Sequence, residues 1–155
     1  MQTFLPYPDF KKSLEVLDWR RLGKQRVEAR QVLNILRDKT STKGWRNHPI
    51  TRMWDGYDNA LAEYMNICIT EWIDRGYNNN MEFAKINDTI VYPHWIGNKS
   101  FHSSHRANLL RKDYEYYSQF GWIEDSENPY SWYDTDKRQW YLQHVGTGVR
   151  EYVNG

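Results

Sequence analysis

A regular spacing of apolar side chains between residues 57 and 76 constrains the fold more than any other feature of the sequence. Apolar side chains recur there at intervals of three and four residues, at Tyr57, Ala60, Leu61, Tyr64, Cys68 and Trp72. This period matches one face of an α-helix, and Gly76 follows at the position of a C-terminal cap. We therefore predict a long amphipathic helix that buries this face.

Turn and cap signals divide the rest of the chain. The expected elements are an extended arm at 1–9, helices at 10–17, 19–37, 81–86 and 104–120, a polar loop at 38–44 and a turn-rich segment at 92–97. The tail from residue 122 is rich in Trp and Tyr but alternates poorly, so we expect mostly irregular structure or one short hairpin. We predict an all-α fold, a compact single-domain bundle of three to four main helices spanning residues 1–155 with a long aromatic tail.

Composition narrows the class of protein. A chain of 155 residues suits one domain, and Cys68 is the only cysteine, which excludes a disulfide framework and a cysteine zinc site. The sequence shows neither a signal peptide nor a membrane-spanning stretch, so we expect a cytoplasmic protein that does not contact membranes. It also lacks a phosphate loop, a dinucleotide fingerprint and a Ser nucleophile elbow. We expect no cofactor.

Charge is unevenly distributed along the chain. Residues 1–50 hold eleven Lys and Arg against five Asp and Glu, a balance of +6, and residues 99–112 add four bases and no acid. Residues 113–136 hold seven acids and no base, so the net charge of +1 conceals two basic segments. This polarity favours a protein that presents one face to a polyanion; the alternative is that charge segregates by helix face.

The predicted helix at 19–37 places polar side chains on its apolar face. On a helical wheel the apolar stripe consists of Leu22, Ala29, Leu33 and Leu36. Arg26 lies inside this stripe and Gln25 lies at its edge. A buried guanidinium needs a carboxylate, a carbonyl array or a phosphate as its partner, whereas an Arg near a helix start can also extend its head group to solvent. Both interpretations stay open.

Two further segments gather polar side chains at predicted helix starts. Gly44–Pro49 places Arg46, Asn47 and His48 before a proline that begins the next helix, an arrangement suited to an anion or a base edge. Farther along, His102–Arg106 begins the predicted helix at 104–120, where Ser103 or Ser104 would cap it and its first N–H groups would bind phosphate. Two histidines three residues apart are too few ligands for a metal, so we expect no metal site.

The order of these motifs resembles a known enzyme family. The motifs are Leu22–Glu28, Asn47–Pro49, Glu71–Tyr77 and Trp140–Gly146. Together they cover about residues 18–77 and 139–148, and they are similar to the phage-type endonuclease V family of pyrimidine-dimer DNA glycosylase/AP lyases. In that family a helix carries an Arg-Glu pair, a later helix ends in Arg-Gly-aromatic, and an aromatic stretch lies near the C-terminus.

The resemblance implies a mechanism and a substrate. Family members use a free N-terminal amine to attack sugar C1′ of a damaged nucleotide and form an imine that permits β-elimination, with a helix Glu nearby. Their Arg and Lys side chains hold phosphates of a kinked duplex from which one base is displaced. Because Gln2 is large, Met1 is expected to stay. The resemblance makes Glu28 the active acid, whereas the helical wheel places Glu28 in a solvated ion pair with Arg21 or Lys24.

The leading hypothesis is therefore a DNA glycosylase, with or without AP lyase activity, acting on a damaged or modified base in duplex DNA. The expected pocket residues are Met1, Gln25, Arg26, Glu28 and His48. The expected nucleic-acid contacts are Arg20, Arg21, Lys24, Arg46, Asn47, Trp95, His102, Ser104, His105, Arg106, Arg111 and Lys112. One alternative is a non-catalytic nucleic-acid or nucleotide binder with the same fold, and another is a small helical interaction protein. The sequence does not indicate an oligomeric state.

Overall fold

The computed structural model describes residues 2–38 and 46–153, which form two compact units. The first unit comprises the chain up to Phe4 together with Asp9–His94, and the second comprises Leu5–Pro8 together with Trp95 and the residues that follow. None of the helices in the described part of the chain has the length and apolar character needed to cross a lipid bilayer.

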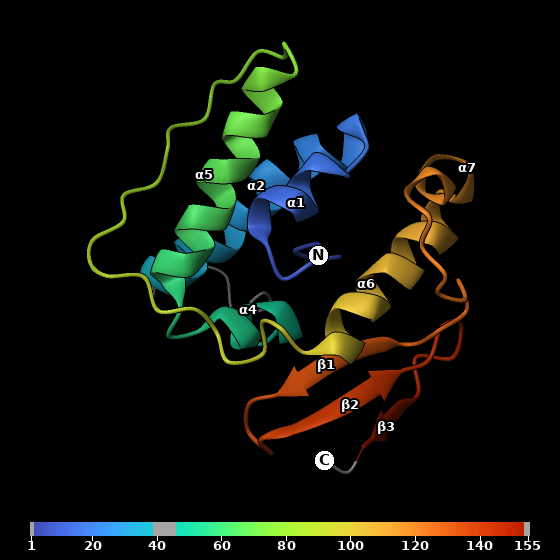
Figure 1. Cartoon of the computed structure of the whole chain (residues 1–155). Helices are drawn as coiled ribbons and strands as arrows, with labels where there is room; N and C mark the ends of the chain where they lie inside the picture. Colours follow the sequence, from blue (N-terminus) through green and yellow to red (C-terminus); the bar gives the residue numbers. More distant parts are fainter. Residues whose placement is uncertain (1, 39–45, 154–155) are drawn as a thin grey trace. The chain divides into compact units, whose positions relative to one another are not determined.

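The first unit is helical and is built around one helix pair (Figure 1). Its elements are α1 (Phe10–Glu15), α2 (Trp19–Arg37), α4 (Pro49–Trp54) and α5 (Asp58–Asp74). Side-chain caps explain where these helices begin: Asp9 accepts from the N–H of Lys12, and Asp18 accepts from the N–H of Arg21. The sequence predictions for α1, α2 and α5 are confirmed, and Gly76 follows α5 with φ of +92°.

Helix α2 buries a slightly different face from the one that the helical wheel predicted. Its buried side chains are Leu22, Gln25, Ala29, Val32, Leu33 and Ile35. Gln25, expected at the edge, is only 1% exposed, whereas Arg26 and Leu36 are half-buried. The wheel was centred on the leucines, but residues 2–4 and Tyr64 of α5 contact Gln25. The polar side chain at the centre of this face is therefore an amide rather than a guanidinium.

The helix expected at 81–86 is absent, and this segment is extended. The Asn66 side chain of α5 donates to the carbonyl of Ala84 and accepts from its N–H, at 2.9 and 2.7 Å. Both hydrogen-bonding groups of Ala84 are thus used by α5 and are unavailable for a helix. The loop expected at 38–44 lies outside the described residues, apart from Asp38.

The second unit contains a sheet that the sequence did not predict, so the expectation of an all-α fold is wrong. Its helical elements are α6 (Lys99–Lys112), α7 (Tyr114–Tyr117) and η1 (Ser118–Phe120). Strands β1 (Tyr130–Asp134), β2 (Gln139–Gln143) and β3 (Arg150–Tyr152) form an antiparallel sheet in the order β1-β2-β3, against which α6 packs through β1 (Figure 1). The tail is thus a compact α+β unit rather than irregular chain.

Helix α6 begins earlier than expected. Asn98 caps it by accepting from the N–H of Phe101 at 2.9 Å, and Gly97 turns the chain before it with φ of +97°. Ser103 and Ser104 consequently lie inside the helix, and the cap predicted for them is wrong. The helix also stops at Lys112, since Asp113 leaves the helical conformation and caps α7 by accepting from the N–H of Tyr116, whereas Gly121 ends the helical segment as predicted.

Candidate active site

Residues 2–4 lie along α2 and are held there by side chains rather than by another strand. The backbone N–H of Gln2 donates to Oε2 of Glu28 at 3.1 Å, and the backbone carbonyl of Gln2 accepts from Nε2 of Gln25 at 2.8 Å. The N–H of Phe4 donates to Oε1 of Gln25 at 2.9 Å. The buried amide of Gln25 therefore fixes both residue 2 and residue 4. The carboxylate of Glu28, one helical turn later, faces the backbone nitrogen of residue 2.

Tyr64 of α5 orients the Gln25 amide. Its hydroxyl lies 2.7 Å from Oε1 of Gln25 and 2.9 Å from the carbonyl oxygen of Phe4. Burial raises the pKa of Tyr64 well above its usual value, so the hydroxyl keeps its proton and acts as a donor. Because Oε1 accepts from Phe4 and Tyr64, Nε2 of Gln25 must face Gln2 and Glu28, where it lies 3.4 Å from Oε2.

Glu28 is half-buried and is not placed as the helical wheel suggested. Its Oε2 atom accepts from the backbone of Gln2 and from Gln25. Arg21, one of the two expected ion-pair partners, pairs instead with the cap residue Asp18 at 3.1 Å. The wheel treated this face of α2 as open to solvent, but residues 2–4 cover it. The result is a carboxylate beside a backbone nitrogen near the start of the chain.

Arg26 occupies a separate location on α2. Its guanidinium carbon lies 4.3 Å from the ring centroid of Trp72, and Nη1 donates to Oδ1 of Asn79 at 2.8 Å. Burial lowers the pKa of Arg26, and its Nε is buried with no hydrogen-bond partner among the described residues. The structure does not bring Arg26 into the hydrogen-bond network of Gln25 and Glu28.

His48 caps α4, which begins at Pro49. Its Nδ1 accepts from the N–H of Ile50 at 3.1 Å, which places the ring proton on Nε2. Burial lowers the pKa of His48, so the ring is neutral at neutral pH. Asn47 is exposed beside it, and Arg46 is half-buried with Nη2 lacking a hydrogen-bond partner in the part of the chain described.

A family model described as pyrimidine dimer DNA glycosylase matches residues 1–85, more than half of the chain. The chain belongs to this glycosylase family. Membership implies DNA as the substrate and base excision as the chemistry. Neither a curated protein nor a solved structure gives a significant match.

The match to this glycosylase family covers every residue of the network just described. Gln2, Gln25, Glu28, His48 and Tyr64 all precede residue 85. The aromatic stretch at 139–148, to which the sequence resemblance also extended, lies outside the matched segment. Apart from Leu5–Pro8, the matched segment belongs to the first unit, where no three His, Cys, Asp or Glu side chains of the described residues come close enough to hold a metal ion.

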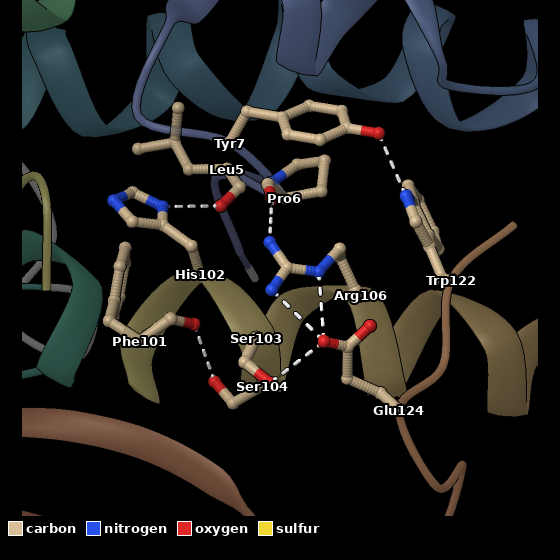
Figure 2. Close-up of polar contacts among 10 residues, drawn as sticks. All are labelled: Leu5, Pro6, Tyr7, Phe101, His102, Ser103, Ser104, Arg106, Trp122 and Glu124. Carbon is tan, nitrogen blue, oxygen red and sulfur yellow. Dashed lines mark hydrogen bonds and ion pairs between the residues drawn. The ribbon is translucent and has the colours of Figure 1, made fainter. Parts of the chain in front are cut away.

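The residues of the second unit that the sequence suggested for DNA contacts are largely internal. His102 and Arg106 bind the backbone of residues 5 and 6: Nδ1 of His102 lies 2.8 Å from the carbonyl of Leu5, and Arg106 donates to the carbonyl of Pro6 at 2.7 Å (Figure 2). Arg106 also forms an ion pair with Glu124 at 3.0 Å. These side chains hold the segment Leu5–Pro8, and a DNA role for them stays a prediction.

The neighbouring candidates are similarly engaged. His105 is fully buried and accepts from the N–H of Leu5 at 2.9 Å, and burial lowers its pKa to about 3. Ser104 donates to the carbonyl of Phe101 at 2.8 Å (Figure 2), and Trp95 is 1% exposed. The phosphate site predicted here depended on a helix beginning at these serines. Since α6 begins at Lys99, their N–H groups do not belong to its first turn.

The remaining cations differ in their accessibility. Arg111 lies over Tyr130 and donates to Asn108, while Lys112 is exposed. Arg20 and Lys24 are both exposed on α2.

Tyr64 was missed as a site residue because it sits in the apolar stripe of α5 and was assigned to the core. The sequence signals were a hydroxyl in that stripe and a glutamine at the edge of the apolar stripe of α2.

Proposed function

We propose that this protein removes a damaged pyrimidine from duplex DNA and then cleaves the strand as an AP lyase. One observation carries the proposal: in the family-matched segment, the backbone nitrogen of residue 2 lies 3.1 Å from the carboxylate of Glu28. While Met1 is present this nitrogen is a peptide amide, and the α-amine is one residue earlier in the chain. An amine close to a carboxylate is the pair of groups that imine chemistry requires. An α-amine has a pKa of about 7.7–8.0, which leaves a reactive neutral fraction at neutral pH.

The proposed reaction has two stages. The amine nitrogen attacks C1′ of the damaged nucleotide, the bond from C1′ to the base breaks, and the base leaves with that electron pair and a proton. The sugar ring then opens at O4′ to give an imine, and loss of a C2′ proton expels the phosphate at C3′. Glu28 accepts the proton that the amine sheds and stabilises the positive charge on the imine nitrogen.

Two positions of the amine are compatible with this role. When Met1 is retained, the amine belongs to Met1; when Met1 is removed, the nitrogen beside Glu28 is itself the amine. Intact mass spectrometry of the protein trapped on DNA assigns the adduct to one of them. An N-terminal glutamine can cyclise and so lose its free amine. A Gln2→Ser chain without Met1 therefore provides a short form whose amine stays free.

The role of Gln25 and Tyr64 is positional. Gln25 holds residues 2–4 against α2 by two hydrogen bonds of 2.8 and 2.9 Å, and the Tyr64 hydroxyl, 2.7 Å from Oε1 of Gln25 and 2.9 Å from the carbonyl oxygen of Phe4, orients this amide. Such a constraint keeps the nucleophile within reach of the carboxylate, which lowers the entropy lost in the reaction. Arg46, Asn47 and His48 are proposed to contact the DNA at the start of α4.

The decisive experiment uses a duplex with one cyclobutane thymine dimer. Wild-type protein should break one glycosidic bond of the dimer, whose base stays tethered through the cyclobutane ring, cleave the strand and form a borohydride-trapped adduct, and Glu28→Gln should lower the cleavage rate by at least about 100-fold. Glu82→Gln, which changes an exposed carboxylate in the same unit, is the matched control. Binding of the lesion duplex without strand cleavage or adduct would support the non-catalytic binder instead, and equal rates for wild type and Glu28→Gln would refute the role of Glu28.

A further inference from the structure

Three aromatic rings and two arginines form a continuous series on the surface of the first unit, which we call the aromatic ladder (Arg20, Trp19, Tyr77, Trp72 and Arg26). The ring centroids of Trp19 and Tyr77 are 6.2 Å apart, and those of Tyr77 and Trp72 are 4.3 Å apart in a stacked arrangement. Arg20 lies 5.2 Å from the Trp19 ring, and Arg26 lies 4.3 Å from the Trp72 ring. The ladder therefore has one cation at each end and three aromatic rings between them.

Local features of α2 and α5 place these rings together. Gly76 turns the chain after α5, so that the N–H of Tyr77 donates to the carbonyl of Trp72 at 3.3 Å and the two rings stack. Trp72 lies directly on Gly23 of α2, where an added Cβ would be 3.1 Å from the indole. Nε1 of Trp72 donates to the carbonyl of Asn78 at 2.8 Å, which fixes the inner ring. The inner part of the ladder is thus rigid.

The outer rings are exposed instead of contributing to a core. Trp19 is 51% exposed and Tyr77 is 39% exposed. Helix α2, which begins at Trp19, carries six Lys and Arg residues and one acid. Arg20 and Lys24 are exposed one helical turn apart, and Lys24 forms no ion pair within the described residues. Exposed aromatic rings beside unneutralised cations are complementary to nucleic acid, whose bases stack and whose phosphates are anionic.

We propose that the aromatic ladder is a second DNA-binding site, which holds an unpaired base on the faces of Trp19 and Tyr77 while Arg20 and Lys24 contact the adjoining phosphates. This inference deepens the proposed function, because excision of a damaged base requires local disruption of the duplex. The site takes single-stranded DNA with little preference among bases, since every base offers a π face. It is distinct from the network around Glu28, since none of the ladder side chains hydrogen-bonds to that carboxylate.

The test compares two ligands on the full chain: a dT 12-mer and a 12-mer of tetrahydrofuran spacers, which keeps the phosphates but has no bases and cannot form an imine. Wild-type protein should bind dT about 5-fold to 150-fold more tightly than the spacer strand, the range of base stacking on one aromatic ring. Trp19→Ala should abolish most of this ratio, and Trp19→Phe should retain it. The double variant Arg20→Ala with Lys24→Ala should weaken the binding of both strands by the same factor.

Tyr114→Ala is the matched control, since Tyr114 is 68% exposed in the second unit and lies outside the ladder. A wild-type protein that binds both strands equally, a Trp19→Ala protein that keeps the ratio, or a Tyr114→Ala protein that loses it would overturn the inference. The dimer-excision assay tests the proposed function, and it is independent of the comparison between the two strands. A protein that excises nothing but prefers dT through Trp19 supports the ladder alone, and one that excises dimers with no dT preference supports the glycosylase alone.

Discussion

Burial of a neutral His105 should make the protein less stable as the pH falls from 7 to 5, because only the unfolded chain gains a proton there. The buried Nδ1 of His105 accepts from the N–H of Leu5, so a protonated ring would place two hydrogens against each other. Burial and the neighbouring charges of His102 and Arg106 lower the pKa of His105 to about 3, whereas the unfolded chain has its ordinary value of about 6.5. The folded state therefore binds fewer protons between these two values, and stability is complete only above pH of about 6.5.

The size of this effect follows from linkage. Over pH 7 to 5 the folded state keeps His105 neutral while the unfolded state protonates it, which costs about 2 kcal/mol of unfolding free energy. His102 and His48 also have lowered pKa values and add losses of the same sign. Burial opposes ionisation of Glu124, but the hydrogen bonds and charge of Arg106 outweigh it and lower its pKa, so the Arg106–Glu124 pair stays intact in this window.

Urea unfolding at pH 7, 6 and 5 measures this loss. The control is His105→Asn, because Oδ1 of asparagine matches the position of Nδ1 and keeps an acceptor for Leu5 without titrating. The variant will be less stable at every pH, since a smaller side chain leaves a cavity. Its loss of stability between pH 7 and 5 should nevertheless be smaller than that of wild type by about 2 kcal/mol. Equal losses in the two proteins would refute the argument.

Three further substitutions test individual contacts of the first unit. Tyr64→Phe removes the donor to Gln25 and should lower the unfolding free energy by about 1–2 kcal/mol and slow excision; unchanged rates would exclude a positioning role. Arg75→Met removes hydrogen bonds to three carbonyls at the end of α1 and should cost about 2–4 kcal/mol in urea unfolding, with Arg75→Lys intermediate. Gly23→Ala should lower the melting temperature, because crowding of the fixed Trp72 ring outweighs the better helix propensity; a higher melting temperature would show that the ring moves freely.

The helices of the first unit were predictable because each depends on local signals. Asp18 supplies the cap of α2, and Gly76 supplies the turn after α5. The period of three and four residues identifies the buried faces between these ends. What the period cannot supply is the exact centre of a buried face, which depends on the packing partner. Gln25 was therefore placed at the edge, and Arg26 was given the central position.

The position of Glu28 and the sheet of the second unit depend on contacts that local patterns do not contain. The wheel describes an isolated helix, so it cannot show that residues 2–4 cover the face that carries Glu28. In the sheet, Trp132 and Tyr133 are neighbours on opposite faces of β1, and Trp140 and Tyr141 repeat this arrangement in β2. Aromatic residues on both faces remove the polar–apolar alternation by which a strand is recognised.

The hydrogen bonds from Gln25 to residues 2–4 depend on the backbone of this segment and not on its side chains. A primary amide offers a donor and an acceptor, as a peptide group does. The Gln25 side chain therefore forms the two hydrogen bonds that a backbone residue of a paired strand would form with Gln2 and Phe4. It contacts only backbone atoms of residues 2 and 4. Side chains in this strand can vary without loss of those bonds, but insertion or deletion of one residue would shift the register and turn a different backbone group toward Glu28. For these hydrogen bonds, the spacing of residues 2–4 therefore matters more than the identity of their side chains.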